Sequence, residues 1–491
     1  MTWRSSSSSC IRSIETLALW HDTYLQSTRP KYQNSAPQHD CYVHDVESPI
    51  KSPVRGTRTR LAPGGFFVKT HQAVAVINAT IIDGTGAAPR PRQSLVVRDG
   101  VIEWMGPHSE LPNLPDDTEF VDIDGATVLP GFMDVHVHLA MDGSLNPAGY
   151  LHEPDALLHF RGVRNARRTL DAGVTTVRDL SGSDYALAMA VEHGIIAGPR
   201  AIMAIHAMGP TGGHSDSRTL TVPFDCHPAG AHFGKTADGE DAARKLTREI
   251  LRMGAGVVKV MATGGVWSPR DAPEHDGFTE KEMRAVVEEA TNKGVYVAAH
   301  AQGANGIKNA LRAGIKSIEH GYLIDDEGIQ LLLDNDAWLV PTLLTGTTPP
   351  DPTKATAYAV EKKNRVRALL EENISRAFAA GVKVALGTDS GVVPHGQNLR
   401  ELGIMVDLGM DPMRAIVAGT TEAARLLGLH DEAGSIEIGK RADLVVTAAN
   451  PLTDIHSLGD PQNISLVIQN GTIVVDRRIR ALALSTDRRT A

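Results

Sequence analysis

Short apolar runs alternate with amphipathic helical patterns along most of the chain, and this alternation limits the fold more than any other feature of the sequence. Helical patterns such as residues 241–253 and 280–292 separate the runs. Several of these patterns end at a glycine suited to a helix C-cap: Gly173, Gly254, Gly294, Gly314 and Gly381. Eight units of this kind predict a parallel α/β domain and favour a (β/α)8 TIM-type barrel over an open doubly wound sheet. The expected strands are residues 131–138, 175–180, 199–205, 256–262, 295–300, 316–320, 337–342 and 383–389.

Additional β segments precede and follow this region. Two of them contain turn dipeptides between alternating apolar residues, Asp99-Gly100 and Asn470-Gly471, which predict tight hairpins. A lone hairpin is marginally stable, so we expect both ends of the chain to build one small composite β-sandwich domain. The predicted boundaries are 71–130 and 430–480 for this domain, 131–429 for the barrel and 481–491 for a C-terminal tail.

The first 70 residues differ in composition from the rest. They carry nine Lys or Arg against five Asp or Glu and begin with a serine run. We expect residues 1–70 to be a poorly ordered extension or a misassigned start; the alternative is an organellar targeting segment. The three cysteines cannot form a disulfide framework and fit a reducing compartment, which predicts a cytoplasmic protein.

Charge and hydropathy argue against two classes of partner. The formal net charge is -9 and no helical pattern gathers basic residues on one face, so nucleic acid is not an expected partner. No apolar run reaches the length of a membrane span. The glycine-rich stretch 209–214 lacks the Lys-Ser/Thr of a phosphate-binding loop, which favours a flexible loop at an active site.

Residues able to bind metals recur at the expected strands, mostly at their carboxyl ends. In "GFMDVHVHLA" two histidines are two residues apart, so on a strand both project from one face while Val135 and Val137 face the other way. Taken singly, each candidate has a structural explanation, such as a satisfied buried histidine, a solvent-facing lysine or a helix cap. Taken together, they gather at the barrel face where catalytic residues occur. The set is His136, His138, Lys259, His300, His320 and Asp389.

Several motifs around these residues resemble the metal-dependent amidohydrolase superfamily. They are "PGFMDVHVHL" (130–139), "VVKVMATGG" (257–265), "AAHAQG" (298–303), "SIEHG" (317–321), "ALGTDS" (385–390) and "GSIEIGKRADLVV" (434–446). The resemblance extends over about residues 73–480 and is closest to the branch with imidazolonepropionase-like proteins, Xaa-Pro dipeptidases and ochratoxinase.

This resemblance implies a centre with two divalent cations, of which zinc is favoured. His136, His138 and Asp389 would bind one ion, and His300 and His320 the other. In this family the strand-four lysine reacts with CO2, so the resemblance implies that Lys259 is an N6-carboxylysine bridging both ions. The ions would activate a shared water and polarise the scissile carbonyl, and Asp389 would serve as general base and then as general acid.

Two comparisons with family patterns concern the substrate. Deaminases and imidazolonepropionase usually have a glutamate three residues after the strand-five histidine, where Gly303 stands here, and many amino-sugar deacetylases lose the lysine that this chain retains. The resemblance therefore implies an amide or peptide hydrolase that releases a C-terminal amino acid from an N-acyl amino acid, a Xaa-Pro dipeptide or an ochratoxin-like amide. The alternatives are a cyclic amide hydrolase or deaminase of the same superfamily, and a non-catalytic scaffold with this fold.

A free carboxylate on such a substrate needs a cation or a hydroxyl donor near the metals. We expect His214, Arg270 and Tyr322, in loops after strands three, four and six, to contact the substrate, although Arg270 is equally explained as a solvated charge and Tyr322 as packing. We also expect Arg178 and Asp179 to form a buried pair that supports the barrel, and the chain to form a homo-oligomer.

Overall fold

The computed structural model describes residues 59–61, 67–69, 73–143, 153–216, 218 and 233–478. The described residues from Thr59 onward form one compact unit. Strands β1 (Thr59–Leu61) and β2 (Phe67–Lys69) pair antiparallel. The rest of the predicted extension and the predicted tail at 481–491 lie outside the described residues, so the expectations about order and targeting stay predictions.

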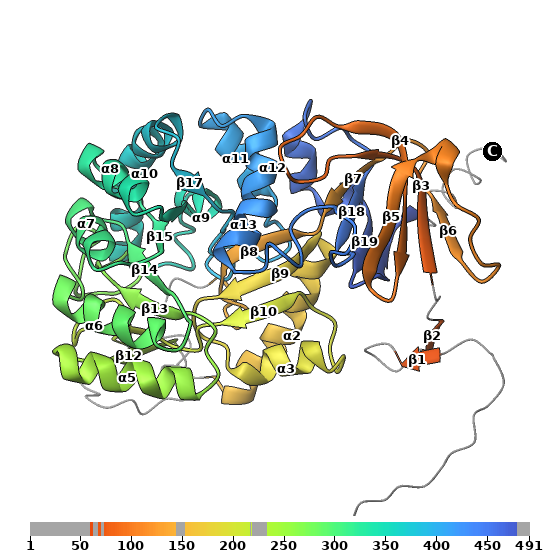
Figure 1. Ribbon diagram of the computed structural model, residues 1–491. Helices are drawn as coiled ribbons and strands as arrows, with labels where there is room; N and C mark the ends of the chain where they lie inside the picture. The colour runs from red at the N-terminus through yellow and green to blue at the C-terminus, as the bar shows by residue number, and fades with distance from the viewer. Residues whose placement is uncertain are drawn as a thin grey trace, which may run out of the picture. The chain divides into compact units, whose positions relative to one another are not determined.

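A TIM-type α/β arrangement forms the larger part of the structure and confirms the predicted fold class (Figure 1). Each of the eight expected strands is present, some of them shorter than predicted. They are β8 (Phe132–Val137), β9 (Val174–Asp179), β10 (Arg200–Met203), β13 (Val258–Met261), β14 (Val297–Ala301), β15 (Ser317–His320), β16 (Trp338–Val340) and β17 (Lys383–Val384). The sequence did not predict two further strands, β11 (Ala207–Gly209), which pairs with β13, and β12 (Gly234–Thr236), which pairs with β11.

The parallel strands form a three-stranded sheet, β10-β9-β8, and a seven-stranded sheet, β12-β11-β13-β14-β15-β16-β17. Backbone hydrogen bonds join the two sheets at both edges. The Val135 N–H donates to the Leu386 carbonyl oxygen at 2.8 Å, and the Gly256 N–H donates to that of Met203 at 2.9 Å. The carboxyl ends of β8 and β13 to β15 and the segment after β17 are thereby brought toward one site.

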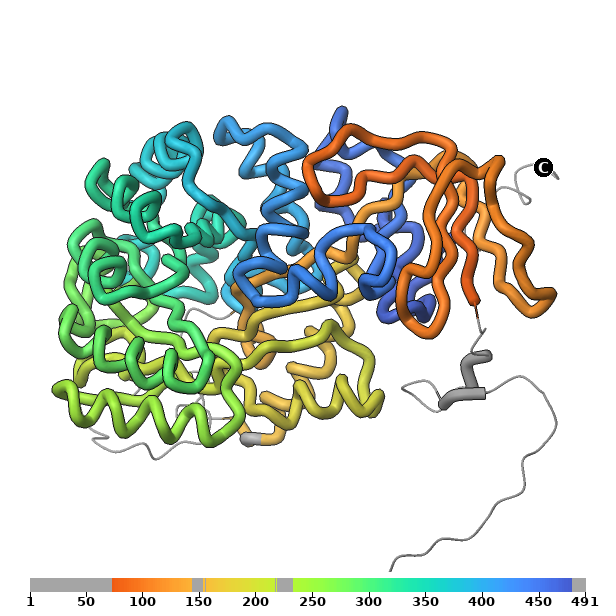
Figure 2. The backbone as a smooth tube through the Cα atoms, viewed as in Figure 1, coloured from red at the N-terminus to blue at the C-terminus, as the bar shows by residue number. Residues whose placement is uncertain are grey.

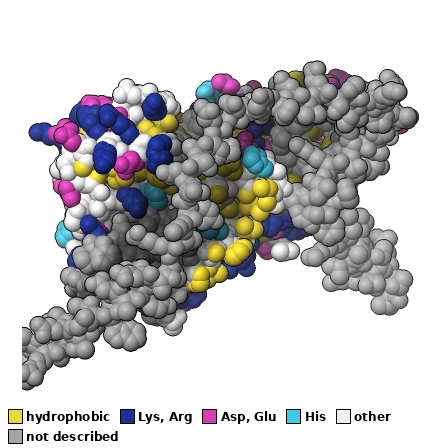
Figure 3. Space-filling view, turned by 90° about the horizontal axis from the view of Figure 1, so that it is seen from below, with side chains coloured by type: hydrophobic (Ala, Val, Ile, Leu, Met, Phe, Trp, Pro, Cys, Tyr) yellow, Lys and Arg dark blue, Asp and Glu magenta, His cyan; other side chains and the backbone are white. Residues whose placement is uncertain are grey.

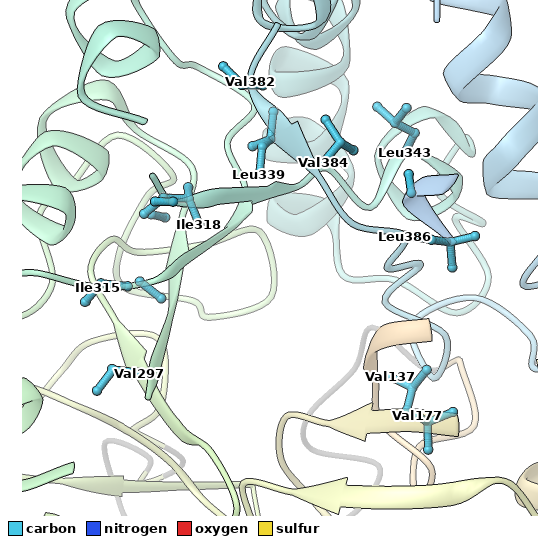
Figure 4. Close-up of a cluster of buried hydrophobic side chains, with 14 of the residues drawn as sticks. Val137, Val177, Val297, Ile315, Ile318, Leu339, Leu343, Val382, Val384 and Leu386 are labelled. Atoms are coloured by element: carbon cyan, nitrogen blue, oxygen red, sulfur yellow. The ribbon is translucent and has the colours of Figure 1, made fainter. Parts of the chain in front are cut away.

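Amphipathic helices lie between the strands, and Figure 1 shows α5 to α8 outside β13 to β15. The largest core lies between these layers; Figure 4 shows part of it, with Val297, Ile318 and Leu339 on neighbouring strands. The helices are α2 (Asp155–Asp171), α3 (Tyr185–Glu192), α5 (Glu240–Arg252), α6 (Glu280–Thr291), α7 (Ala304–Arg312), α8 (Asp326–Asp334), α9 (Leu343–Thr347), α10 (Ala357–Ala379), α11 (Arg400–Asp407), α12 (Pro412–Ala418) and α13 (Thr421–Leu426).

Strands from the beginning and the end of the described chain form one composite sheet, seen as adjacent orange and blue segments in Figure 2. Its strands are β3 (Ala73–Ile81), β4 (Arg90–Arg98), β5 (Val101–Pro107), β6 (Glu119–Asp122), β7 (Thr127–Pro130), β18 (Leu444–Thr447), β19 (Ile464–Gln469) and β20 (Thr472–Asp476). They are connected as a single eight-stranded sheet, because β3 pairs first with β6 and then with β7. Residues of β4, β5, β18 and β19 share one core cluster, so the sheet packs against itself.

Both predicted hairpins are present. Arg98 pairs with Val101 around Asp99-Gly100, and Gln469 pairs with Thr472 around Asn470-Gly471. All four turn residues have positive φ, as this turn type requires. The Asn-Gly and Asp-Gly signals therefore identified both turns correctly.

The described surface mixes charges of both signs. On the face in Figure 3, basic and acidic side chains are interspersed. Ion pairs between helices and loops contribute to this mixing, for example Arg365 with Glu274 at 2.8 Å. Within the described ranges, no helix combines the length and the apolarity that crossing a bilayer requires.

Candidate metal centre

Strand β8 brings two histidines to its carboxyl end through an irregular register. The pairing of β8 with β9 shifts between Asp134 and Val137, so strict alternation of side chains is lost there. Val135 and Val137 consequently pack in different clusters of buried residues, and the expectation that they share a face is wrong. His136 is buried, and its backbone carbonyl accepts a hydrogen bond from the Asp389 N–H at 2.8 Å.

Asp389 completes a three-residue group with these histidines. Its Oδ1 lies 3.2 Å from Nε2 of His138 and 3.5 Å from Nε2 of His136. One ligand atom from each residue lies within 4.8 Å of the other two. The backbone of Asp389 has φ 58°, a left-handed conformation that turns the side chain toward β8.

Each of the four candidate histidines has one ring nitrogen held by the protein. Nδ1 of His138 donates to the Ser181 carbonyl oxygen at 3.0 Å, and Nε2 of His300 donates to that of Gly264 at 3.0 Å. Nδ1 of His136 donates to the Glu319 carboxylate at 2.9 Å, and Nδ1 of His320 bonds the Thr342 hydroxyl at 2.8 Å. Among the described residues, the second nitrogen of His136, His300 and His320 is left for another ligand, while Nε2 of His138 lies 3.2 Å from Asp389. One ring nitrogen held by the protein is typical of metal-binding histidines.

The histidines of β14 and β15 lie beside this group. The rings of His300 and His320 are 4.6 Å apart, and those of His136 and His320 are 5.0 Å apart. Burial lowers the pKa of His136, His300 and His320 well below the usual value, so these imidazoles are neutral at physiological pH. Neutral imidazole is the form that binds a metal ion.

Lys259 lies in β13 and is only 2% exposed. Its neighbours Val258 and Val260 pack in the large core, so alternation along the strand turns Lys259 to the opposite face. The positive charge of Lys259 further lowers the pKa of His136, His300 and His320, which places its ammonium within electrostatic range of all three rings. Burial lowers the pKa of Lys259 itself to about 8, so part of the population carries a neutral amine near pH 7.

A buried ion pair between Arg178 and Glu319 holds the His136 ring in place. Arg178 donates to Oε1 of Glu319 at 2.7 Å, while Oε2 of Glu319 accepts from His136. The expected pairing of Arg178 with Asp179 is wrong, because consecutive residues of a strand point to opposite faces. Asp179 instead accepts hydrogen bonds from the N–H groups of Leu139 and Ser181.

The three residues expected to contact substrate have different surroundings. His214 stacks on His300 with ring centroids 4.4 Å apart, and its Nδ1 lies 2.8 Å from the Ser268 hydroxyl. Tyr322 lies beside His320, and its hydroxyl bonds Thr342. Arg270 is exposed and donates to a backbone carbonyl, that of Arg218, at 2.7 Å. Only His214 and Tyr322 therefore lie against the histidine cluster.

Close packing around His214 explains the paired glycines of "ATGGVWS". A Cβ on Gly265 would lie 2.3 Å from Cε1 of His214, and one on Gly264 would lie 2.4 Å from the Ala272 carbonyl oxygen. Any larger residue would displace the loop that supplies the acceptor for His300. Glycine is therefore required here by space rather than by backbone conformation.

Sequence reasoning did not identify Glu319 and Thr342, which orient His136 and His320. Glu319 carried a usable signal, because a carboxylate within the apolar run "KSIEHG" must find a buried partner. Thr342 carried none: its role depends on φ 46°, which no local pattern predicts.

The sequence profile of the amidohydrolase family matches residues 127–474, which include all six candidate metal ligands. The chain belongs to the amidohydrolase family. Ochratoxinase of Aspergillus niger is 30% identical to this amidohydrolase over 427 residues, covering 82% of this chain and 86% of the relative. Imidazolonepropionase of Deinococcus deserti is 27% identical over 404 residues, covering 74% and 88%. A Xaa-Pro dipeptidase solved with methionine bound in the active site has a TM-score of 0.75 and 31% identity, covering 82% of this chain and 100% of that one.

These relatives confirm the superfamily and the branch that the motifs indicated. The protein is a hydrolase acting on amide bonds, and small molecules with an amide bond are the substrates that fit its family. The alternative of a non-catalytic scaffold is not supported. Enzymes of this family are typically metal-dependent, and the group of His136, His138 and Asp389 is a potential metal site.

Proposed function

We propose that this amidohydrolase binds two divalent cations, with zinc favoured, and releases a C-terminal amino acid from N-acyl amino acids, Xaa-Pro dipeptides or ochratoxin-like amides. The observation that carries the proposal is the meeting of three electron-pair donors. With Nδ1 of His136 and His138 acting as hydrogen-bond donors, Nε2 of each neutral ring faces the Asp389 carboxylate through a lone pair, and without a metal ion a proton on Nε2 of His138 that hydrogen-bonds Asp389 relieves the repulsion. Such atoms repel one another unless a proton or a cation lies among them, and nitrogen and oxygen donors suit zinc.

A second cation is supported by the adjacent pair of histidines. Nδ1 of His300 and Nε2 of His320 each keep a lone pair that can bind a cation, and both rings lie next to the first group. Lys259 would bridge the ions after its neutral amine adds to CO2, which forms an N–C bond and releases a proton. The product is a carbamate, whose negative charge replaces the positive charge that the ammonium placed among these ligands.

The bound cations would supply Lewis acidity to the scissile carbonyl and lower the pKa of a bound water. Asp389 supplies the proton transfers. Burial opposes its ionisation, but the hydrogen bond from His138 and the nearby positive charges lower its pKa, so the carboxylate is the resting form. This carboxylate accepts a proton from the attacking water and then delivers it to the amide nitrogen as the C–N bond breaks.

The substrate class is supported by the relatives and by one position of this chain. Ochratoxinase and a Xaa-Pro dipeptidase that holds an amino acid in its active site are among the similar proteins. Gly303 occupies the position of the glutamate typical of the cyclic-amide branch, and a Cβ there would lie 2.8 Å from the Pro273 carbonyl oxygen. A glutamate at this position would therefore require the loop at Pro273 to move.

Metal content and turnover test the proposal together. Wild type incubated with zinc and bicarbonate is expected to bind about two ions per chain and to release amines from N-acetyl amino acids, Xaa-Pro dipeptides or ochratoxin. Lys259→Ala is expected to lose metal and activity, together with the carbamate signal in ¹³C spectra recorded with labelled bicarbonate. Lys354→Met is the matched control, because the Lys354 side chain is 70% exposed and should affect none of these measurements.

Two results would contradict the proposal. Wild-type protein that binds no metal would exclude the centre. Protein that binds metal and hydrolyses hydantoin but none of the acyclic substrates would favour the cyclic-amide alternative.

A further inference from the structure

Helix α10 presents an apolar face to the interior with one lysine in the middle of it. The buried positions Ala359, Val366, Leu370 and Ile374 recur at helical spacing, and Lys363 lies on the same stripe with an exposure of 6%. A buried ammonium is unfavourable unless a partner compensates its charge. Helix packing alone therefore does not explain why a charged residue stands at position 363.

The neighbouring cations of α10 are all engaged. Lys362 donates to the carbonyl of Ser268 at 2.7 Å, Arg365 pairs with Glu274 at 2.8 Å, and Arg367 donates to the Thr347 carbonyl at 2.9 Å. For Lys363, by contrast, no hydrogen bond or ion pair is formed within the part of the chain that the structure describes. Its side chain is largely buried, and its ammonium is left to pair with an anion.

The beginning of α10 is tied to the rim of the candidate metal centre. Tyr358 donates to the Trp267 carbonyl at 3.1 Å, and Lys362 also donates to that of Gly265 at 3.3 Å. This is the loop whose Gly264 holds His300. Burial lowers the pKa of Lys363 to about 8, and the Asp389 carboxylate counteracts part of that effect, so the two charges lie within electrostatic range.

We propose that Lys363 is the substrate-binding residue that pairs with the free carboxylate of the C-terminal amino acid. The inference rests on the proposed function, which requires a substrate with this group. A carboxylate entering beside the metal centre would meet an ammonium on a side chain that is largely shielded from water, and a charge-assisted pair in such surroundings is strong. The sequence suggested Arg270 as the cation that binds the substrate carboxylate, but Arg270 is exposed and donates to a backbone carbonyl. We assign this role to Lys363 instead.

Substrate pairs that differ only in the carboxylate test this role. The zinc-loaded enzyme would be assayed for acetate release from N-acetyl-L-phenylalanine and N-acetyl-L-proline and from their C-terminal primary amides. Lys363→Met is expected to raise KM for the acids about 10- to 100-fold, with kcat changed little and the amides unaffected. Lys363→Arg should retain most of the preference for the acids, and Lys354→Met should behave as wild type.

Two further measurements separate a substrate-binding role from a structural one. Lys363→Met is expected to raise the melting temperature, because an apolar side chain of similar length replaces an unpaired buried charge. Calorimetric titration of the zinc-loaded protein with L-phenylalanine and L-phenylalaninamide should show that the substitution weakens binding of the acid only.

The outcomes distinguish the two proposals. If wild type hydrolyses the acids but Lys363→Met changes acids and amides alike, or neither, the role of Lys363 is overturned and the proposed function stands. If wild type hydrolyses none of the acids, the proposed function fails. The titration then decides the inference alone: equal binding of L-phenylalanine by wild type and Lys363→Met overturns it, as does a lack of binding by both.

Discussion

At the scale of single residues, the candidate centre is held in conformations that the backbone disfavours. His320, Thr342 and Asp389 have φ of 74°, 46° and 58°, in the left-handed region that costs a non-glycine residue about 1–3 kcal/mol. Surrounding contacts maintain this geometry; for example, the Glu401 carboxylate accepts from the N–H groups of Leu343 and Leu344. The strain accounts for the orientation of His320 and Asp389, whose side chains turn toward the other ligands.

A buried histidine behind the centre predicts a specific sensitivity to acid. Nε2 of His395 donates to the His138 carbonyl and Nδ1 accepts from Thr169, so the neutral ring satisfies both partners. Burial lowers the pKa of His395 to about 4, below the value near 6.5 of an unfolded chain. The unfolded state therefore binds a proton first, and this contribution to stability, fully present above pH 6.5, is lost as pH falls toward 4.

His395→Gln isolates this contribution, because glutamine offers a donor and an acceptor without titrating. The free energy of unfolding in urea would be measured with metal removed. Between pH 7 and pH 5 it should fall by about 2 kcal/mol more for wild type than for the variant. Other titrating groups affect both proteins equally. Parallel losses in the two proteins would contradict the predicted pKa.

At the scale of elements, the two hairpin turns from opposite ends of the chain lie against each other. The Ala442 N–H donates to the Gly100 carbonyl at 2.8 Å, and the Gly471 N–H donates to that of Ala442 at 3.0 Å. A Cβ on Gly471 would lie 2.8 Å from Cα of Gly100. The closeness of the turns thus depends on glycine at this position.

Alanine substitution tests this contact between hairpins. Gly471→Ala should lower the free energy of unfolding through its positive φ of 75° and through the clash with Gly100. Gly125→Ala is the matched control, since Gly125 has φ 82° and no atom within 4 Å of the added Cβ. In urea unfolding, we expect the free energy of unfolding to fall by about 1–3 kcal/mol more for the Gly471 variant than for the control. Equal losses would mean that the turns do not touch.

At the scale of the whole molecule, the composite sheet and the barrel share one core. Val445 and Val467 of the sheet belong to the same cluster as Val174 and Leu170 of the barrel. Gln469 adds hydrogen bonds across this junction, donating to the Thr175 carbonyl at 3.1 Å and to that of Gly198 at 3.2 Å. The predicted boundary between two domains therefore crosses a continuous apolar interior.

Shared packing predicts that the two parts unfold together. Hydrogen exchange followed by mass spectrometry in increasing urea should show peptides of β19 and β14 losing protection at one urea concentration. Gln469→Ala should shift both transitions equally to lower urea. Earlier loss of protection in β19 alone would instead support two independently stable domains. The domain boundaries and the homo-oligomer stay predictions until such measurements are made.

Local sequence patterns predicted the eight main parallel strands, the two hairpin turns and the candidate metal ligands. The reason is that these properties depend on local patterns: apolar runs mark the strands, glycines with positive φ such as Gly173 and Gly381 end helices, and Asn-Gly marks a turn. The motifs around His136, Lys259 and Asp389 then indicated the family.

The orientation of these side chains and the partners that support them follow from the three-dimensional packing alone. The register shift of β8, the pairing of Glu319 with Arg178 and the burial of Lys363 all depend on contacts between segments far apart in the chain. Local patterns carry no information on such contacts, because a buried charge or a strained φ is stable only when distant residues compensate it.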